Sequence, residues 1–224
     1  MNAKGHATRP APLLALAVVA GATDVAAFTR LGAVFASMMT GNLTLLGVAA
    51  AHASGNLAAL IGFALIGYVA GVALGTRIGG AAITEVRWPR PVTVILIVEL
   101  VAWIGLTIGW EVTGAHPGGA TQFVLLADAT AAMGLQAAAM RRLDTGVSTT
   151  YLTGTLTAAI ASVVTGGVRA RQNGLNIGVL LAHVAGAAAG GALILSAADA
   201  LPILPLVALI GVIATAVTVA EASH

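Results

Sequence analysis

The sequence predicts an all-α integral membrane protein with six transmembrane helices and two re-entrant half-helices, arranged as two inverted repeats in a single membrane domain, 1–224. Three observations support this fold class. Hydrophobic residues make up 58% of the 224 residues and charged residues only 8%, against roughly 25% charged residues in soluble domains. The basic residues are distributed unevenly between the two sides of the predicted bundle. The two halves of the chain also share motifs at a nearly constant offset.

The composition excludes several classes of protein. A mean hydropathy of +0.99 leaves too little polar surface for a soluble domain, and disordered chains have the opposite composition. The absence of cysteine rules out disulfides, thiolate metal sites and thiol nucleophiles. The ten basic residues are spread along the chain rather than clustered with aromatic residues, so no nucleic acid partner is expected. Twenty-eight glycines favour closely packed helices in lipid.

Eight apolar segments follow one another, each close to the roughly 20 residues that a helix needs to cross the hydrocarbon. The first is interpreted as a membrane span rather than a cleaved signal peptide, because seven more follow it. The segments are 11–29, 33–51, 57–79, 91–110, 122–140, 148–165, 174–197 and 201–220.

The basic residues decide how many of these segments cross the membrane. If all eight cross and the N-terminus is cytoplasmic, four basic residues lie inside and six outside, which contradicts the positive-inside rule. If the second and sixth segments enter and leave on the same side, nine lie inside and only Arg30 lies outside. The sequence therefore favours six full spans, two re-entrant segments and cytoplasmic termini.

An internal repeat relates the first half, about 11–110, to the second, about 122–220. A shift of 113 residues places Gly21 over Gly134, and Met39-Thr40-Gly41-Asn42-Leu43-Thr44 over Leu152-Thr153-Gly154-Thr155-Leu156-Thr157. A shift of 111 aligns Gly67, Gly71, Gly75 and Gly79 with Gly178, Ala182, Gly186 and Gly190. Three crossings in each half would make the halves inverted, as in many transporters. The alternative is a chance match between helices rich in glycine and alanine.

Two related motifs, Thr40-Gly41-Asn42 and Thr153-Gly154-Thr155, lie inside the re-entrant segments. Thr is a good N-cap, so we expect half-helices from Gly41 to about His52 and from Gly154 to about Thr165. Entering from opposite faces, they would direct two N-termini, each with about half a positive charge, at the membrane midplane. Such ends bind anions, orient polar solutes or repel cations. The alternative is two ordinary spans whose Thr hydroxyls bond to the preceding turn.

Five further polar side chains fall inside the apolar segments, where an ionisable group normally faces a cavity or a partner. Asp24 and Asp128 lie at similar depths near the outer ends of their spans, and the alternative for both is an interfacial acid. Glu99 and His183 lie near the middle of theirs and are candidates for a proton relay, or for satisfied core groups. Gln136 is first a candidate for hydrogen bonding between helices and second a site residue.

The first half also carries a family resemblance. The stretch Gly21-Ala22-Thr23-Asp24, followed by Phe35, Met39-Thr40-Gly41-Asn42-Leu43 and Gly47, resembles the signature of the YoaK family of small bacterial multi-pass membrane proteins, a domain of unknown function. Length and hydropathy match over essentially the whole chain, whereas the second half lacks the Asn of the motif. The resemblance implies a bacterial inner-membrane protein and transfers no substrate.

The leading functional hypothesis is a transporter or channel for a small solute or ion, with proton or cation coupling at Asp24. The alternatives are a non-transporting membrane scaffold and an intramembrane enzyme, although the sequence has no zinc-protease helix motif and no Gly-x-Ser-x-Gly elbow. No catalytic residue, metal or cofactor is expected. The expected partners are the lipid bilayer, a small-molecule or ion substrate, and a second copy of the chain through the glycine ridges.

Overall fold

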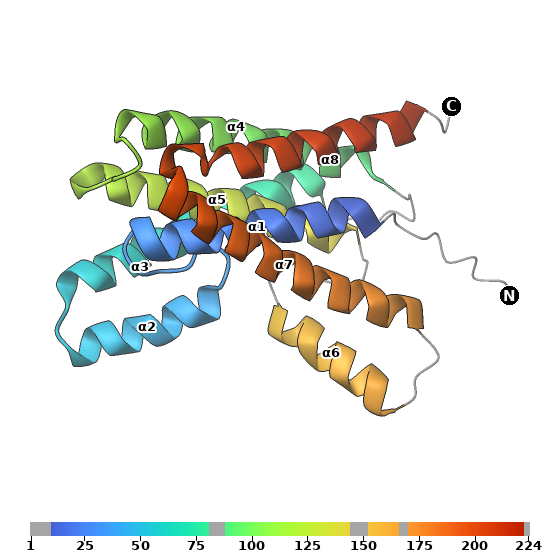
Figure 1. Cartoon of the computed structure of the whole chain (residues 1–224), viewed down its shortest axis with the longest axis horizontal. Coiled ribbons are helices and arrows are strands. Elements are labelled where there is room, and N and C mark those ends of the chain that lie inside the picture. The colour runs from blue at the N-terminus through green and yellow to red at the C-terminus, as the bar shows by residue number, and fades with distance from the viewer. Residues whose placement is uncertain (1–9, 81–87, 144–151, 166–169, 222–224) are drawn as a thin grey trace, which may run out of the picture.

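The computed structural model describes residues 10–80, 88–143, 152–165 and 170–221, which form helices and connecting loops without a strand. Six long helices are apolar and long enough to cross a membrane. They are α1 (Pro10–Arg30), α3 (Gly55–Gly79), α4 (Arg90–Val112), α5 (Gly119–Arg142), α7 (Ala170–Ser196) and α8 (Ile203–Glu221) (Figure 1). A short 3-10 helix, η1 (Ala198–Ala200), connects α7 to α8. The predicted all-α membrane fold is confirmed.

Two shorter apolar helices, α2 (Met39–Ala51) and α6 (Leu152–Val164), have 13 residues each. At 1.5 Å per residue each is about 20 Å long, which is less than the roughly 30 Å of the hydrocarbon core. In Figure 1, α2 begins near the middle of the bundle and runs back to the end where α1 finishes. The helix α6 also begins near the middle and runs to the opposite end, where α5 finishes. Both therefore return to the side from which their segment entered.

The helix directions of the two halves can be compared in Figure 1. The helix α1 starts and α8 finishes at the same end of the bundle, and α1, α3 and α4 run opposite to α5, α7 and α8 respectively. The packing partners also correspond, since α1 packs on α7 as α5 packs on α3, and α2 packs on α3 as α6 packs on α7. That the halves are inverted copies of one another stays a prediction.

Glycine is required where the long helices cross. At the α3–α5 crossing, Gly71 faces the carbonyl oxygen of Ala131 and Gly134 faces that of Tyr68. At the α1–α7 crossing, Gly21 faces the carbonyl oxygen of His183, and Gly186 similarly faces the backbone of α1. A Cβ at any of these four glycines would overlap the opposing backbone. The close approach of these helices therefore depends on the missing side chains.

The contacts correct the predicted alignment of the glycine ladders. Gly71 and Gly186 occupy equivalent places, 115 residues apart, so the equivalence lies one helical turn beyond the predicted shift of 111. The element starts agree with the contacts, since α3 and α7 start 115 residues apart. The shift of 111 also matched because small residues recur at every fourth position of both ladders, so a displacement by four residues still aligns them.

The same contacts bear on the predicted homo-oligomer. The ridge residues of α3 pack on α5, and those of α7 pack on α1, within one chain: Gly67, Gly71, Gly75, Gly186 and Gly190. These ridges are therefore occupied internally and are not available to a second copy. A homo-oligomer would have to form through another surface.

Alanine at Gly71 should destabilise the fold because its Cβ would overlap the Ala131 carbonyl. We expect Gly71→Ala to lower the free energy of unfolding by about 1–3 kcal/mol, the usual cost of overpacking. Gly62→Ala, on the same helix but with open space around the added Cβ, is the matched control and should be neutral or stabilising by about 0.5–1 kcal/mol. Unfolding in detergent measures both, and equal stability of the two variants would contradict the close crossing.

Single cysteines should report the re-entrant paths, because the chain has no native cysteine. We expect Thr29→Cys and Ser54→Cys, which bracket α2, to react with an impermeant thiol reagent from the same side of the membrane. Arg142→Cys and Thr165→Cys, which bracket α6, should both react from the other side. Labelling of positions 29 and 54 from opposite sides would mean that α2 crosses the membrane.

Candidate functional site

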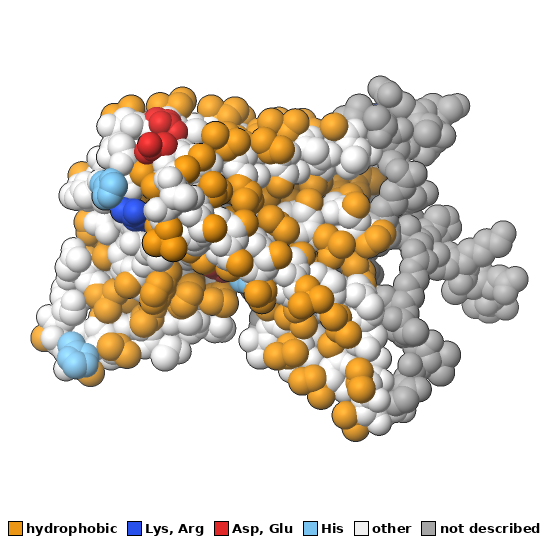
Figure 2. Space-filling view, in the orientation of Figure 1, with side chains coloured by type: hydrophobic (Ala, Val, Ile, Leu, Met, Phe, Trp, Pro, Cys, Tyr) orange, Lys and Arg blue, Asp and Glu red, His pale blue; other side chains and the backbone are white. Residues whose placement is uncertain are grey.

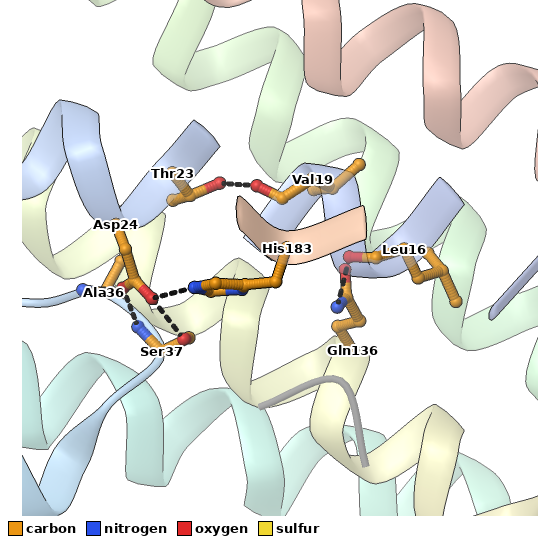
Figure 3. Close-up of polar contacts among 8 residues, drawn as sticks. All are labelled: Leu16, Val19, Thr23, Asp24, Ala36, Ser37, Gln136 and His183. Carbon is orange, nitrogen blue, oxygen red and sulfur yellow. Dashed lines mark hydrogen bonds and ion pairs between the residues drawn. The ribbon is translucent and has the colours of Figure 1, made fainter. Parts of the chain in front are cut away.

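The loop between α1 and α2, residues 31–38, is bound to the carboxylate of Asp24. Its Oδ1 accepts hydrogen bonds from the backbone N–H groups of Ala36 at 2.8 Å and Ser37 at 2.7 Å. Its Oδ2 accepts one from the Ser37 hydroxyl at 2.6 Å (Figure 3). Asp24 is only 4% exposed. The carboxylate thus satisfies backbone groups that a non-helical segment would otherwise leave unpaired inside the membrane.

Asn42, in the first turn of α2, holds the same loop from the other side. Its Oδ1 accepts a hydrogen bond from the Phe35 N–H at 2.9 Å, and its Nδ2 donates to the Phe35 carbonyl oxygen at 2.7 Å. Asn42 is fully buried. Asp24 and Asn42 together bind residues 35–37, and we call this arrangement the loop clamp. The clamp fixes where α2 begins.

His183 on α7 approaches the loop clamp across the α1–α7 crossing. Its Nε2 lies 4.0 Å from Asp24 Oδ2, and the two side chains are 13% and 6% exposed. The Nδ1 atom of the same ring is buried and has no hydrogen-bond partner among the described residues. Figure 3 shows the ring directed at the carboxylate from the opposing helix. The two ionisable groups therefore meet inside the bundle.

This pair lies beside a hollow in the molecular surface. In Figure 2 a gap separates the lobes formed by α2 and α6, and an acidic and a histidine side chain just reach the surface at its inner end. The slight exposure of Asp24 and His183 agrees with this view. Apolar side chains cover much of the visible surface of both lobes.

The predicted capping role of the Thr residues is wrong. The helix α2 begins at Met39, so Thr40 and Gly41 lie in its first turn, and the cap residue Met38 makes no side-chain cap bond. Thr40 is exposed, and its carbonyl accepts a bond from the Thr44 hydroxyl at 3.2 Å. The polar side chain that bonds to the preceding loop is that of Asn42, two residues further on.

In the second half, Thr153 and Gly154 lie inside α6 rather than at its cap, because the helix already includes Leu152. Thr153 is exposed, whereas Thr155 is buried at 5% exposure. Thr155 is the equivalent of Asn42 at the shift of 113, and both face the interior. The loop before α6 lies outside the described residues.

The remaining predicted site residues do not join the Asp24–His183 pair. Gln136 is fully buried and donates from Nε2 to the Leu16 carbonyl oxygen at 3.0 Å, which links α5 to α1. Asp128 is half-buried on α5 against Gly105 of α4. Glu99 is fully buried, and its oxygens have no hydrogen-bond partner among the described residues. The predicted Glu99–His183 relay is therefore not formed, because His183 faces Asp24 instead.

Sequence reasoning missed Ser37 and the backbone of residues 35 and 36. Ser37 lies 13 positions after Asp24, a separation that corresponds to no helical period, so only the fold brings them together. Within the described residues, no three His, Asp or Glu side chains gather as metal ligands would.

The loop clamp predicts different effects of two substitutions at one position. Asp24→Ala leaves three buried donors unpaired, and each unpaired donor costs about 1–3 kcal/mol, so we expect a loss of at least about 3 kcal/mol in the free energy of unfolding. Asp24→Asn should cost less than about 1 kcal/mol, because its oxygen still accepts two N–H bonds and its amide can donate to the Ser37 hydroxyl. Ser37→Ala removes one bond and should fall between them. Equal stability of the Ala and Asn variants would exclude the clamp.

Comparison with known proteins places the chain in a family. Residues 13–216 match the family model described as protein of unknown function (DUF1275). A UPF0700 transmembrane protein, YoaK, from Bacillus subtilis (strain 168) is 32% identical over 152 residues. The matched region covers 66% of this chain and 64% of that protein, just under two thirds of its length. No solved structure matches. The resemblance seen in the signature residues is thus confirmed, and the chain belongs to the DUF1275 family of proteins of unknown function.

Proposed function

We propose that this protein is a transporter or channel for a small solute, coupled to protons or cations at the Asp24–His183 pair. The observation that carries the proposal is this contact between two ionisable side chains of different helices, beside the hollow between α2 and α6. An ionisable group inside a membrane helix is costly and commonly marks a substrate or ion pathway. No catalytic role is proposed for any residue.

His183 distinguishes the proposal from a purely structural interpretation. Three hydrogen bonds from the loop account fully for a structural role of Asp24. They do not account for His183, which lies beyond hydrogen-bond distance of the carboxylate and whose Nδ1 has no partner among the described residues. A histidine that gains a proton would strengthen its attraction to Asp24, and one that loses it would weaken that attraction.

The arrangement of the short helices supports a pathway at this place. Both α2 and α6 begin near the middle of the bundle and run to opposite ends (Figure 1). Helix N-termini carry partial positive charge, and transporters with inverted repeats use interrupted helices of this kind near the midplane to bind solutes and ions. The opposite directions of corresponding helices in the two halves are consistent with such a repeat.

The same directions support cytoplasmic termini in a bacterial inner membrane. The end of the bundle at which α1 starts also carries the basic residues of α3, α4 and α5: Arg77, Arg90, Arg141 and Arg142. Arg30 lies at the other end. Under the positive-inside rule the first end is cytoplasmic.

The groups that could influence the pair are few in the described part of the chain. Arg30 ends α1 and is within 3.5 Å of the Ile194 carbonyl oxygen, and Asp199 lies on η1. On α5 the charged side chains are Asp128 and the two arginines of the last turn. The described side chains of α6 include no titratable group.

The proposal predicts that the pair controls proton movement. In liposomes with an entrapped pH-sensitive dye, the wild-type protein should carry protons down an imposed gradient, and light scattering should report permeation of a small solute panel. His183→Gln and Asp24→Asn should each lower proton flux at least tenfold while leaving the protein folded, because each removes one ionisable partner and keeps hydrogen-bonding capacity.

His52→Gln is the matched control, since His52 is exposed at the end of α2 and should leave the flux unchanged. If wild-type liposomes behaved like empty ones towards protons and every solute, the protein would be a scaffold. Normal flux with an unchanged pH profile in both variants would remove the coupling role from the pair.

A further inference from the structure

A second buried acid lies away from the Asp24–His183 pair. Glu99, in the middle of α4, has no exposed surface, and both carboxyl oxygens are buried without a hydrogen-bond partner among the described residues. Trp103, one turn further along the same helix, is 2% exposed and its Nε1–H also has no partner among those residues. Residues four apart share a helix face, so the two groups are neighbours.

Among the described residues, every other acid, amide or hydroxyl side chain that is at most 5% exposed has a hydrogen-bond partner. Thr23 and Thr130 bond to carbonyls of their own helices, and Gln136 bonds to Leu16. A side chain that only fills space inside the membrane does not need a carboxyl group, because burying an acid is costly. A buried acid with a structural role is expected to have a hydrogen-bond partner. Glu99 meets neither description.

We propose that Glu99 is an exchangeable proton-binding site, separate from the Asp24–His183 pair. An ionised carboxylate that is fully buried with no counter-charge among the described residues would be strongly disfavoured, so the acid holds a proton in the described conformation. In that form its carbonyl oxygen can accept the Trp103 Nε1–H, and its O–H can donate to the preceding helical turn. Release transfers the proton from the carboxyl oxygen to water and leaves the carboxylate, which requires the face of α4 to open.

A small apolar pocket lies beside Trp103. Trp103 lines a small apolar pocket at the meeting of α1, α4 and α8, together with Thr23, Leu106, Trp110 and Pro205. The pocket has a volume of only about 10 Å³, room for one water molecule at most, so release of the proton requires the helices around Glu99 to shift. The nearest hydrogen bond between α4 and another element in this region lies near the end of α4, away from Glu99. It runs from Trp110 Nε1 to the Ala198 carbonyl oxygen at 3.0 Å.

The charged groups of the neighbouring helices leave Glu99 isolated. Asp128 on α5 lies against Gly105, on the exposed face of α4. Glu99 lies on the buried face of the same helix. Arg77 ends α3, and Arg141 and Arg142 end α5. The described side chains of α8 include no titratable group. A proton at Glu99 is therefore controlled by access rather than by a counter-charge.

Infrared spectroscopy of the reconstituted full chain tests this site directly. The wild-type protein at neutral pH should show the C=O stretching band of a protonated carboxylic acid, and the band should shift when the buffer is changed to D₂O. Glu99→Gln should remove this band, and Glu99→Asp should keep a protonated acid with a displaced band. Glu111→Gln, at the exposed end of the same helix, and Asp24→Asn should leave the Glu99 band in place.

A spectrum at neutral pH without a band that depends on Glu99 would overturn the proposal. A band that stays unshifted in D₂O would overturn it too, because the proton would then be trapped rather than exchangeable. The inference rests on the proposed function only where it implies that the proton at Glu99 takes part in transport. If the protein carried no flux, a band that shifts and depends on Glu99 would still establish the site.

Discussion

The constraint on which the structure depends is that a backbone inside the hydrocarbon must have its polar groups bonded within the protein. A helix meets this requirement by itself, but the loop 31–38 does not. Asp24 and Asn42 provide the missing partners for residues 35–37. Only with these bonds can the chain turn inside the bundle and start a half-helix near its middle. The first role of Asp24 and Asn42 is therefore to stabilise the loop that lets α2 begin inside the bundle.

The glycine crossings determine what else can reach the clamp. Because Gly21 lets α1 approach the backbone of α7 at His183, the histidine ring lies across from Asp24 rather than in lipid. A larger residue at position 21 would move the two helices apart and separate the pair. The small residues and the ionisable residues are thus parts of one arrangement, in which close packing creates the polar contact.

The six spans and the two half-helices could be predicted from the sequence because hydropathy and basic residues report directly on membrane crossing. The predicted capping role of Thr40 was wrong, because Asn42 makes the hydrogen bonds to the preceding loop instead. It both accepts a bond from the Phe35 N–H and donates one to the Phe35 carbonyl oxygen. The predicted alignment of the glycine ladders was wrong by one helical turn, because small residues at every fourth position match equally well when one ladder is displaced by four residues. The contacts of Ser37 and His183 with Asp24 are tertiary contacts, and no local pattern in a single sequence predicts them.

The two halves offer an internal comparison that separates packing from function. At the shifts that match the contacts, Asp24 corresponds to Ala137 and His183 to Tyr68, on helices that cross through glycine in the same manner. The α3–α5 crossing is thus built without a carboxylate or a histidine at the places where α1 and α7 carry them. Helix crossing alone does not require the pair, and the loop clamp requires Asp24 but not His183. What is left unexplained by packing is a histidine directed at a carboxylate beside a hollow, and it is this residue that most needs a functional explanation.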